Sequence, residues 1–97
     1  MHPLAVIQEA DPAFFDHLAE AQRFVFSDGA LPRKTKLLIA LAFDAAHGAV
    51  QGVRALGGQA LQAGAGKEEI LEALRVASLL GGVGSAYTAA SALDGLL

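Results

Sequence analysis

Apolar side chains recur along this chain every three or four residues, which is the spacing of a helix that buries one face. Asp11-Pro12 predicts the start of a first helix, because Asp caps helix N-termini and Pro suits the first helical position. This helix ends at Ser27-Asp28-Gly29. A second helix opens at Leu31-Pro32 and ends at His47-Gly48, where glycine can take the left-handed conformation that closes a helix.

Three further helices are predicted in the rest of the chain. One runs from about residue 49 to 63, one begins near Lys67, and one spans about 84–93 after the Gly81-Gly82 break. Ala and Leu dominate and β-branched residues are few, so no strand is expected. The pattern therefore predicts an all-α fold of about five helices, a single domain over 1–97, with residues 1–10 as a loose N-terminus.

The composition indicates more apolar surface than one small domain can hide. The chain has 97 residues, of which 54% are hydrophobic, whereas a domain of this size buries only about 60–65% of its unfolded surface. Gly52, Gly57 and Gly58 each cost roughly 1 kcal/mol inside the predicted third helix. Close approach by a neighbouring helix would compensate for that cost. Both observations favour an obligate homo-oligomer.

Charge and cysteine content exclude several classes of function. Seven basic and ten acidic residues give a net charge of −3 without any concentrated basic patch, so nucleic acid is not an expected partner. The uncharged stretch 76–93 holds too many small and polar residues for a membrane span. The chain contains no cysteine, which excludes thiol and disulfide chemistry and fits a reducing compartment. With no signal peptide recognised, we expect a cytoplasmic protein.

One group of polar residues could support acid–base chemistry. Asp44, His47, Gln51 and Arg54 are spaced three, four and three apart, so a continuous helix would place them on one face. A His beside an acid, with Arg54 to hold a substrate carboxylate, could transfer protons. Gly48 interrupts this helix, however. We therefore favour the alternative, in which these residues form a solvated or subunit-facing polar edge and His47 helps to end the helix.

Other candidates for chemistry are weaker. His17 and Glu20 have the spacing of two metal ligands on one helix but lack a local third, so no metal site is expected. No phosphate-binding loop is present, and no cofactor is expected. Tyr87 fits a core or interface position better than a catalytic one. The phenylalanines are expected in the core or in a pocket wall; they are Phe14, Phe15, Phe24, Phe26 and Phe43.

Two blocks of sequence resemble a known family. They are Leu-Pro-Arg-Lys-Thr-Lys-Leu-Leu-Ile-Ala-Leu-Ala over 31–42 and Ala-Leu-Gln-Ala-Gly-Ala-Gly-Lys-Glu-Glu-Ile-Leu-Glu-Ala-Leu over 60–74. This pairing, at this separation, is similar to the carboxymuconolactone decarboxylase and alkylhydroperoxidase D family. The resemblance covers about residues 25–93. It implies an all-α alkylhydroperoxidase D-like domain that assembles into symmetric trimers or hexamers.

The family's catalytic residues have no counterpart in this chain. Aligned without gaps, the family's Glu falls on Leu37, its two Cys positions on Ala49 and Gly52, and its His on Leu56. The stripe through Ala49, Gly52 and Leu56 is therefore small and apolar, and it suits either tight helix packing or the wall of an apolar ligand-binding pocket. Asp44 and His47 belong to a stripe about 200° away, which predicts that they point in nearly the opposite direction.

Two functions remain open after these observations. One is an oligomeric protein without peroxidase activity that binds a small apolar or carboxylate ligand, or a partner protein. The alternative is a cofactor-free decarboxylase-type enzyme, acting on a small carboxylate or lactone with His47 and Arg54 as catalytic residues. Whether His47 and Arg54 line one enclosed pocket distinguishes the two.

Overall fold

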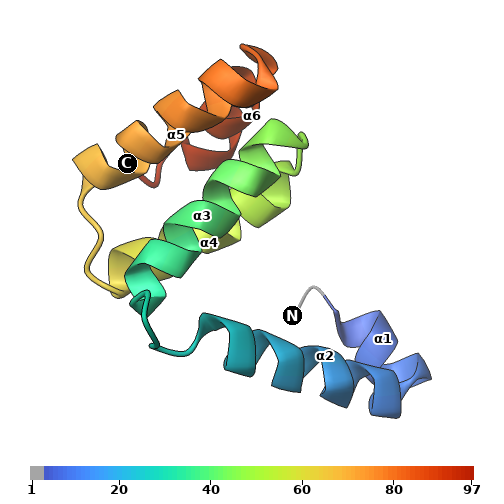
Figure 1. Cartoon of the computed structure of the whole chain (residues 1–97). Helices are drawn as coiled ribbons and strands as arrows, with labels where there is room; N and C mark the ends of the chain where they lie inside the picture. The colour runs from blue at the N-terminus through green and yellow to red at the C-terminus, as the bar shows by residue number, and fades with distance from the viewer. Residues whose placement is uncertain (1–3) are drawn as a thin grey trace.

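The computed structural model describes residues 4–97 as six helices without a strand, which confirms the predicted all-α fold (Figure 1). The five expected helices have the predicted order and nearly the predicted bounds. In chain order the helices are α1 (Ala5–Ala10), α2 (Pro12–Phe26), α3 (Arg33–Ala46), α4 (Val50–Gln62), α5 (Lys67–Gly81) and α6 (Gly84–Leu93).

The additional helix, α1, lies in the segment that was expected to be loose. Gln8 N–H donates to the Leu4 carbonyl at 2.9 Å and Asp11 N–H to the Ile7 carbonyl at 2.7 Å, so the segment 4–11 is hydrogen-bonded as a helical turn. It packs against α2 and against no other helix. Residues 1–3, which belong to the same expectation, lie outside the described part of the chain.

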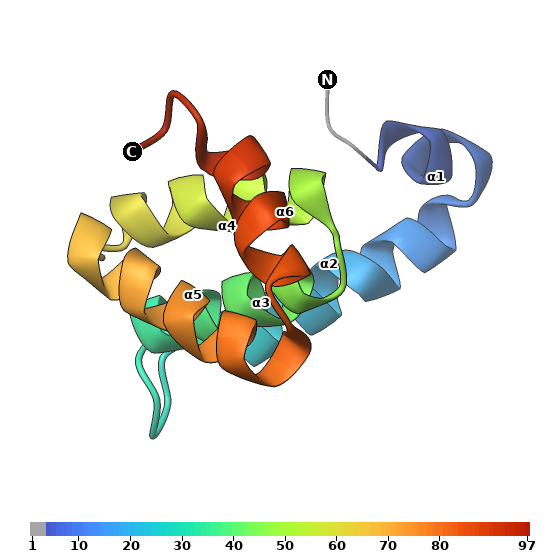
Figure 2. The same ribbon diagram turned by 90° about the horizontal axis from the view of Figure 1, so that it is seen from above.

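Helices α3 to α6 form a bundle that contains the core. α4 and α5 each pack against both α3 and α6. α6 therefore contacts both α4 and α5, as Figure 2 shows from above. All buried residues of the described chain lie between residues 37 and 93. The largest fully buried side chains are Leu37, Leu41, Val53 and Ile70, and most of the others are alanines. The core is therefore narrow, and it depends on close approach of the helix backbones.

Two glycines provide that close approach within the single protomer. A Cβ atom at Gly57 would lie 2.7 Å from Cδ2 of Leu93, on the facing helix α6. A Cβ atom at Gly81 would lie 2.8 Å from Cβ of Ala46, on α3. Gly58 has open space around it. The cost of Gly57 is thus compensated inside the chain, and only Gly58 still fits the expectation of contact with another copy.

The helices α1 and α2 form an arm that extends away from the bundle (Figure 1). No residue of either helix is buried, and the side chain of Phe24 is 81% exposed. Phe14 and Phe24 are therefore not core residues, contrary to the prediction, because in the protomer only the end of α2 reaches α3. Phe26, the last residue of α2, does pack against the core.

Local hydrogen bonds fix the ends of the helices, and the first of them is the predicted N-cap at Asp11. The Asp11 carboxylate accepts from Phe14 N–H at 3.1 Å, which caps α2. Asp28 Oδ1 accepts from Arg33 N–H at 2.6 Å at the start of α3. Lys36 Nζ donates to the Ser27 carbonyl at 2.7 Å, just beyond the end of α2. The bonds of Asp28 and Lys36 connect the end of the arm to the start of the bundle.

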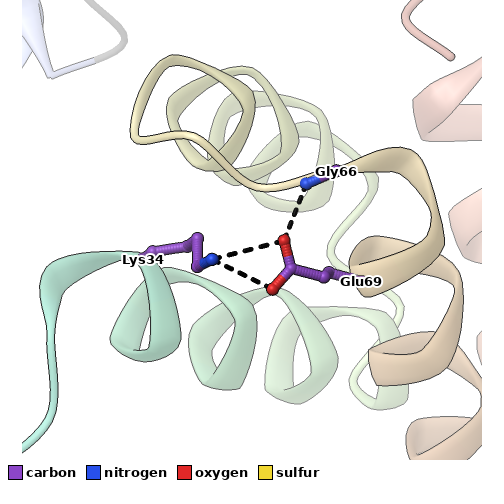
Figure 3. A network of polar contacts seen from close by, with 3 residues as sticks. All are labelled: Lys34, Gly66 and Glu69. Atoms are coloured by element: carbon purple, nitrogen blue, oxygen red, sulfur yellow. Dashed lines mark hydrogen bonds and ion pairs between the residues drawn. The ribbon is translucent and has the colours of Figure 1, made fainter.

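A polar network connects the start of α3 to the start of α5 (Figure 3). Glu69 Oε2 lies 3.0 Å from Lys34 Nζ, and Glu69 Oε1 accepts from Gly66 N–H at 2.8 Å. The second bond is the backbone half of a capping box. The Gly66 N–H, followed by the Lys34 ammonium, holds the pKa of Glu69 below its ordinary value of 4.5.

Candidate functional site

An open groove of about 780 Å³ lies between α2, α3 and α4. Its wall is mainly apolar, and its volume falls in the range of small-molecule sites. Polar side chains are few, which is also typical of a ligand site. The lining residues are Gln22, Val25 and Phe26 from α2, Lys36, Ile39, Ala40, Phe43 and Asp44 from α3, and Gly52, Ala55, Leu56 and Gln59 from α4.

The structure places the predicted ligand-binding stripe partly in this groove. Gly52 and Leu56 line it, whereas Ala49 is half-buried at the start of α4 and does not. Leu37 has no exposed surface and belongs to the core. On the alignment that the resemblance implies, this is the position of the family's Glu, and it is closed to water.

Asp44 lies in the same groove as Gly52 and Leu56, which corrects the prediction that it points the opposite way. The prediction assumed one continuous helix. Gly48 has φ +74° and separates α3 from α4, which folds back and packs along α3. The turn brings the last turn of α3 against the first turn of α4, so Asp44 faces Gly52 across it.

His47 closes α3 at the surface. Its backbone N–H bonds to carbonyls of the last turn, and its ring Nδ1 lies 2.8 Å from the Phe43 carbonyl. The ring also stacks on the Phe43 ring with centroids 4.1 Å apart. The side chain is exposed. These contacts are those of a residue that ends a helix.

Arg54 joins α4 to the end of α6. Its Nη1 donates to the carbonyl of Ala92 at 3.0 Å and to that of Asp94 at 2.9 Å. A cation at the C-terminal end of a helix satisfies free carbonyls and is favoured by the helix dipole. Neither His47 nor Arg54 lines the groove between α2, α3 and α4.

A second open groove of about 670 Å³ lies between α5 and α6. Leu71 and Leu74 form one wall, and Ala86, Ala90 and Leu93 form much of the other. It contains none of the positions that match the family's catalytic residues. Tyr87, on the neighbouring surface of α6, is 75% exposed, so in the protomer it is not a core residue.

Residues 4–97 contain no cluster of three His, Asp or Glu side chains that could hold a metal ion. His17 and Glu20, the pair with ligand spacing, are both exposed on α2. In the same part of the chain, no helix is both long and apolar enough to cross a membrane.

The comparisons with known proteins agree with this geometry. The family model for carboxymuconolactone decarboxylases matches residues 12–95. The chain belongs to the carboxymuconolactone decarboxylase family. A crystal structure of apo-lpg0406, a protein of this family from Legionella pneumophila, superimposes with a TM-score of 0.87. The two sequences are 32% identical, and the alignment covers 94% of this chain and 81% of the other. None of the curated proteins matches.

This member of the carboxymuconolactone decarboxylase family shares the fold of its structural neighbour and has a mainly apolar groove between α2, α3 and α4. The residue that sequence reasoning misplaced is Asp44, whose carboxylate lies in the groove. The predicted helix end at His47-Gly48 was the feature of the sequence that could have placed the Asp44 side chain correctly. Folding the following helix back at this point places Asp44 opposite Gly52, whereas a straight helix separates them.

Proposed function

We propose that this protein is a non-peroxidase member of the family that binds a small, largely apolar ligand in the groove between α2, α3 and α4. One observation carries the proposal. Gly52 and Leu56, at positions matching a family Cys and the family His, line a groove of about 780 Å³ with mainly apolar walls. A groove of this size and lining suits a small molecule.

The absence of cysteine supports the part of this proposal that excludes peroxidase activity. A thiol peroxidase needs a thiolate nucleophile, and the chain has none. We expect no saturable hydroperoxide turnover with a dithiol reductant above the rate in buffer. Measurable enzyme-dependent turnover would contradict the proposal.

The binding test uses octanol as an apolar probe. Binding is measured by the changes in amide chemical shifts of the isotope-labelled protein. We expect saturable shifts at groove residues such as Ile39 and Leu56. Ala55→Trp should fill the groove and abolish them, because Ala55 lines it and is exposed enough to accept a larger side chain. Ala90→Trp is the matched control, since Ala90 lines the second groove. Shifts that survive Ala55→Trp but not Ala90→Trp would move the site to α5 and α6.

We further propose that the protein is a homo-oligomer, a trimer or a hexamer. Large apolar side chains stand exposed on two separate surfaces, with Phe24 on the arm and Leu79, Leu80 and Val83 where α5 passes into α6. Monomeric soluble proteins rarely expose large apolar patches. Light scattering after size exclusion should give a mass three or six times 9.9 kDa. A folded species at the monomer mass at micromolar concentration would refute the assembly.

A further inference from the structure

We propose that the groove selects ligands with a cationic amine head group, which is bound by the Asp44 carboxylate while the apolar tail lies along the groove. This inference rests on the proposed function, since it specifies the class of ligand for the same groove. It depends on three observations: the position of Asp44, its lack of a partner in the protein, and the side chains beside it.

The position of Asp44 depends on Gly52. A Cβ atom built at Gly52 would collide with Oδ2 of Asp44 and would lie 3.0 Å from its Cγ. The carboxylate therefore occupies the space into which any side chain at position 52 would project. Position 52 matches a cysteine of the family's redox pair. A fixed negative charge thus stands here where the peroxidase members carry a sulfur atom.

The carboxylate has no partner within residues 4–97. None of the hydrogen bonds or ion pairs of that part of the chain includes its oxygens, and the N-cap position of α4 has no side-chain cap. The cation in the groove, Lys36, and the next arginine along α4, Arg54, both have other partners. Lys36 Nζ bonds to the Ser27 carbonyl, and Arg54 bonds to carbonyls at the end of α6. A half-buried carboxylate against an apolar wall is stabilised by a cation or a donor, and here the ligand can supply it.

The side chains beside Asp44 suit an amine with an apolar tail. The Phe43 ring lines the same groove, and an aromatic face attracts a cation. Val25, Ile39 and Leu56 extend the wall with aliphatic surface. Lys36 lines the same groove, but its ammonium donates to the Ser27 carbonyl, whereas the Asp44 carboxylate is repulsive to an anionic head group. We therefore expect the groove to favour a cationic head group over an anionic one.

A purely structural role for Asp44 is the competing explanation. The carboxylate lies near the start of α4, where the helix dipole favours a negative charge. That role requires no ligand, and it predicts that the head group of a bound molecule has no effect on affinity. The two explanations therefore differ in a quantity that can be measured.

The experiment compares octylamine, octanol and octanoate, which share a tail and differ in the head group. Binding to the full chain is followed by titration calorimetry and by amide shifts around Gly52. We expect octylamine to bind about tenfold more tightly than octanol, and octanoate to bind more weakly than either. Equal affinity for the amine and the alcohol would overturn the amine selectivity but leave the apolar site intact. Failure of all three to bind saturably would overturn the proposed function itself.

Two variants test whether Asp44 is responsible. Asp44→Asn removes the charge and keeps the shape, so the tenfold preference should disappear while octanol affinity is unchanged. Gly52→Ala keeps the charge but displaces the carboxylate, and it should also reduce the preference. Asp16→Asn, on the exposed surface of α2, is the matched control and should change nothing. A preference for octylamine that persists in both Asp44→Asn and Gly52→Ala would refute the assignment.

Discussion

The arm and the bundle have similar hydrophobic patterns in sequence, but the apolar faces of the bundle helices are buried and that of the arm is exposed. α2 repeats apolar residues at helical spacing and has a well-formed N-cap, as the bundle helices do, yet it buries no residue. In α3, by contrast, Leu37, Leu41 and Ala45 are all buried. Periodicity determines which face of a helix is apolar, whereas the topology of the fold determines whether another helix covers that face. The uncovered apolar face of the arm is the main reason to expect another copy of the chain.

The largest test of this comparison removes a buried side chain from the bundle. Ile70 has no exposed surface, so Ile70→Ala should lower the free energy of unfolding by about 2–5 kcal/mol. Phe24→Ala, on the arm, should change it by less than about 0.5 kcal/mol in the isolated protomer. Urea denaturation over a range of protein concentrations measures both. A large cost for Phe24→Ala that falls on dilution would show that another copy covers the arm.

A smaller effect is expected where the bundle closes on α6. Arg54→Ala removes two hydrogen bonds from a guanidinium to carbonyls of Ala92 and Asp94. Because the side chain is largely exposed, we expect a loss of about 1.5 kcal/mol, the lower end of the range for hydrogen bonds to a charged group. Arg75→Ala is the control, since Arg75 is exposed and makes no hydrogen bond within residues 4–97. Equal melting temperatures for the two variants would contradict the assignment of Arg54 as a cap of α6.

Adjacent glycines of α4 give a test of packing inside the bundle. Gly58→Ala should stabilise the protein by about 1 kcal/mol, because the site is open and Ala is the better helix former. Gly57→Ala should not increase stability in this way, because the added Cβ atom would collide with the side chains of Leu93 and Leu96. Thermal unfolding of both variants measures the difference. If Gly58→Ala also destabilised the protein, and more strongly at higher concentration, Gly58 would lie in an interface between copies.

The smallest expected effect is a dependence of stability on pH from Glu69. Its pKa is lowered in the folded protein, so the carboxylate stabilises the fold above the ordinary pKa of 4.5, and that contribution is lost as the pH falls through the lowered value. Glu69→Gln should therefore reduce stability at pH 7 and have little effect well below pH 4. Lys34→Met should reproduce part of this effect, because the Lys34 ammonium is the second cause of the lowered pKa. If Glu69→Gln lowered stability by the same amount at pH 7 and at low pH, the ion pair between Glu69 and Lys34 would not be the cause of the pH dependence.

The fold could be predicted from sequence because its signals are local. Helix starts at Asp11-Pro12 and Lys67, and the end at His47-Gly48, depend on residues within one turn of each boundary. The short helix α1 was missed because six residues contain too little periodicity to detect. The groove depends on which helices pack together, and a stripe drawn on one straight helix cannot show it. That is why the contact between Asp44 and Gly52 emerged only from the structure.

The fit between Asp44 and Gly52 also constrains how this protein can change over time. A cysteine introduced at position 52 would place its Cβ atom in the space of the Asp44 carboxylate, so the carboxylate would have to turn away. Conversely, while position 52 remains glycine, Asp44 can be retained without a steric cost. The two positions therefore form an epistatic pair in which the order of substitution matters. A side chain introduced at position 52 while Asp44 is present would therefore force the carboxylate to turn away, as expected for Gly52→Ala.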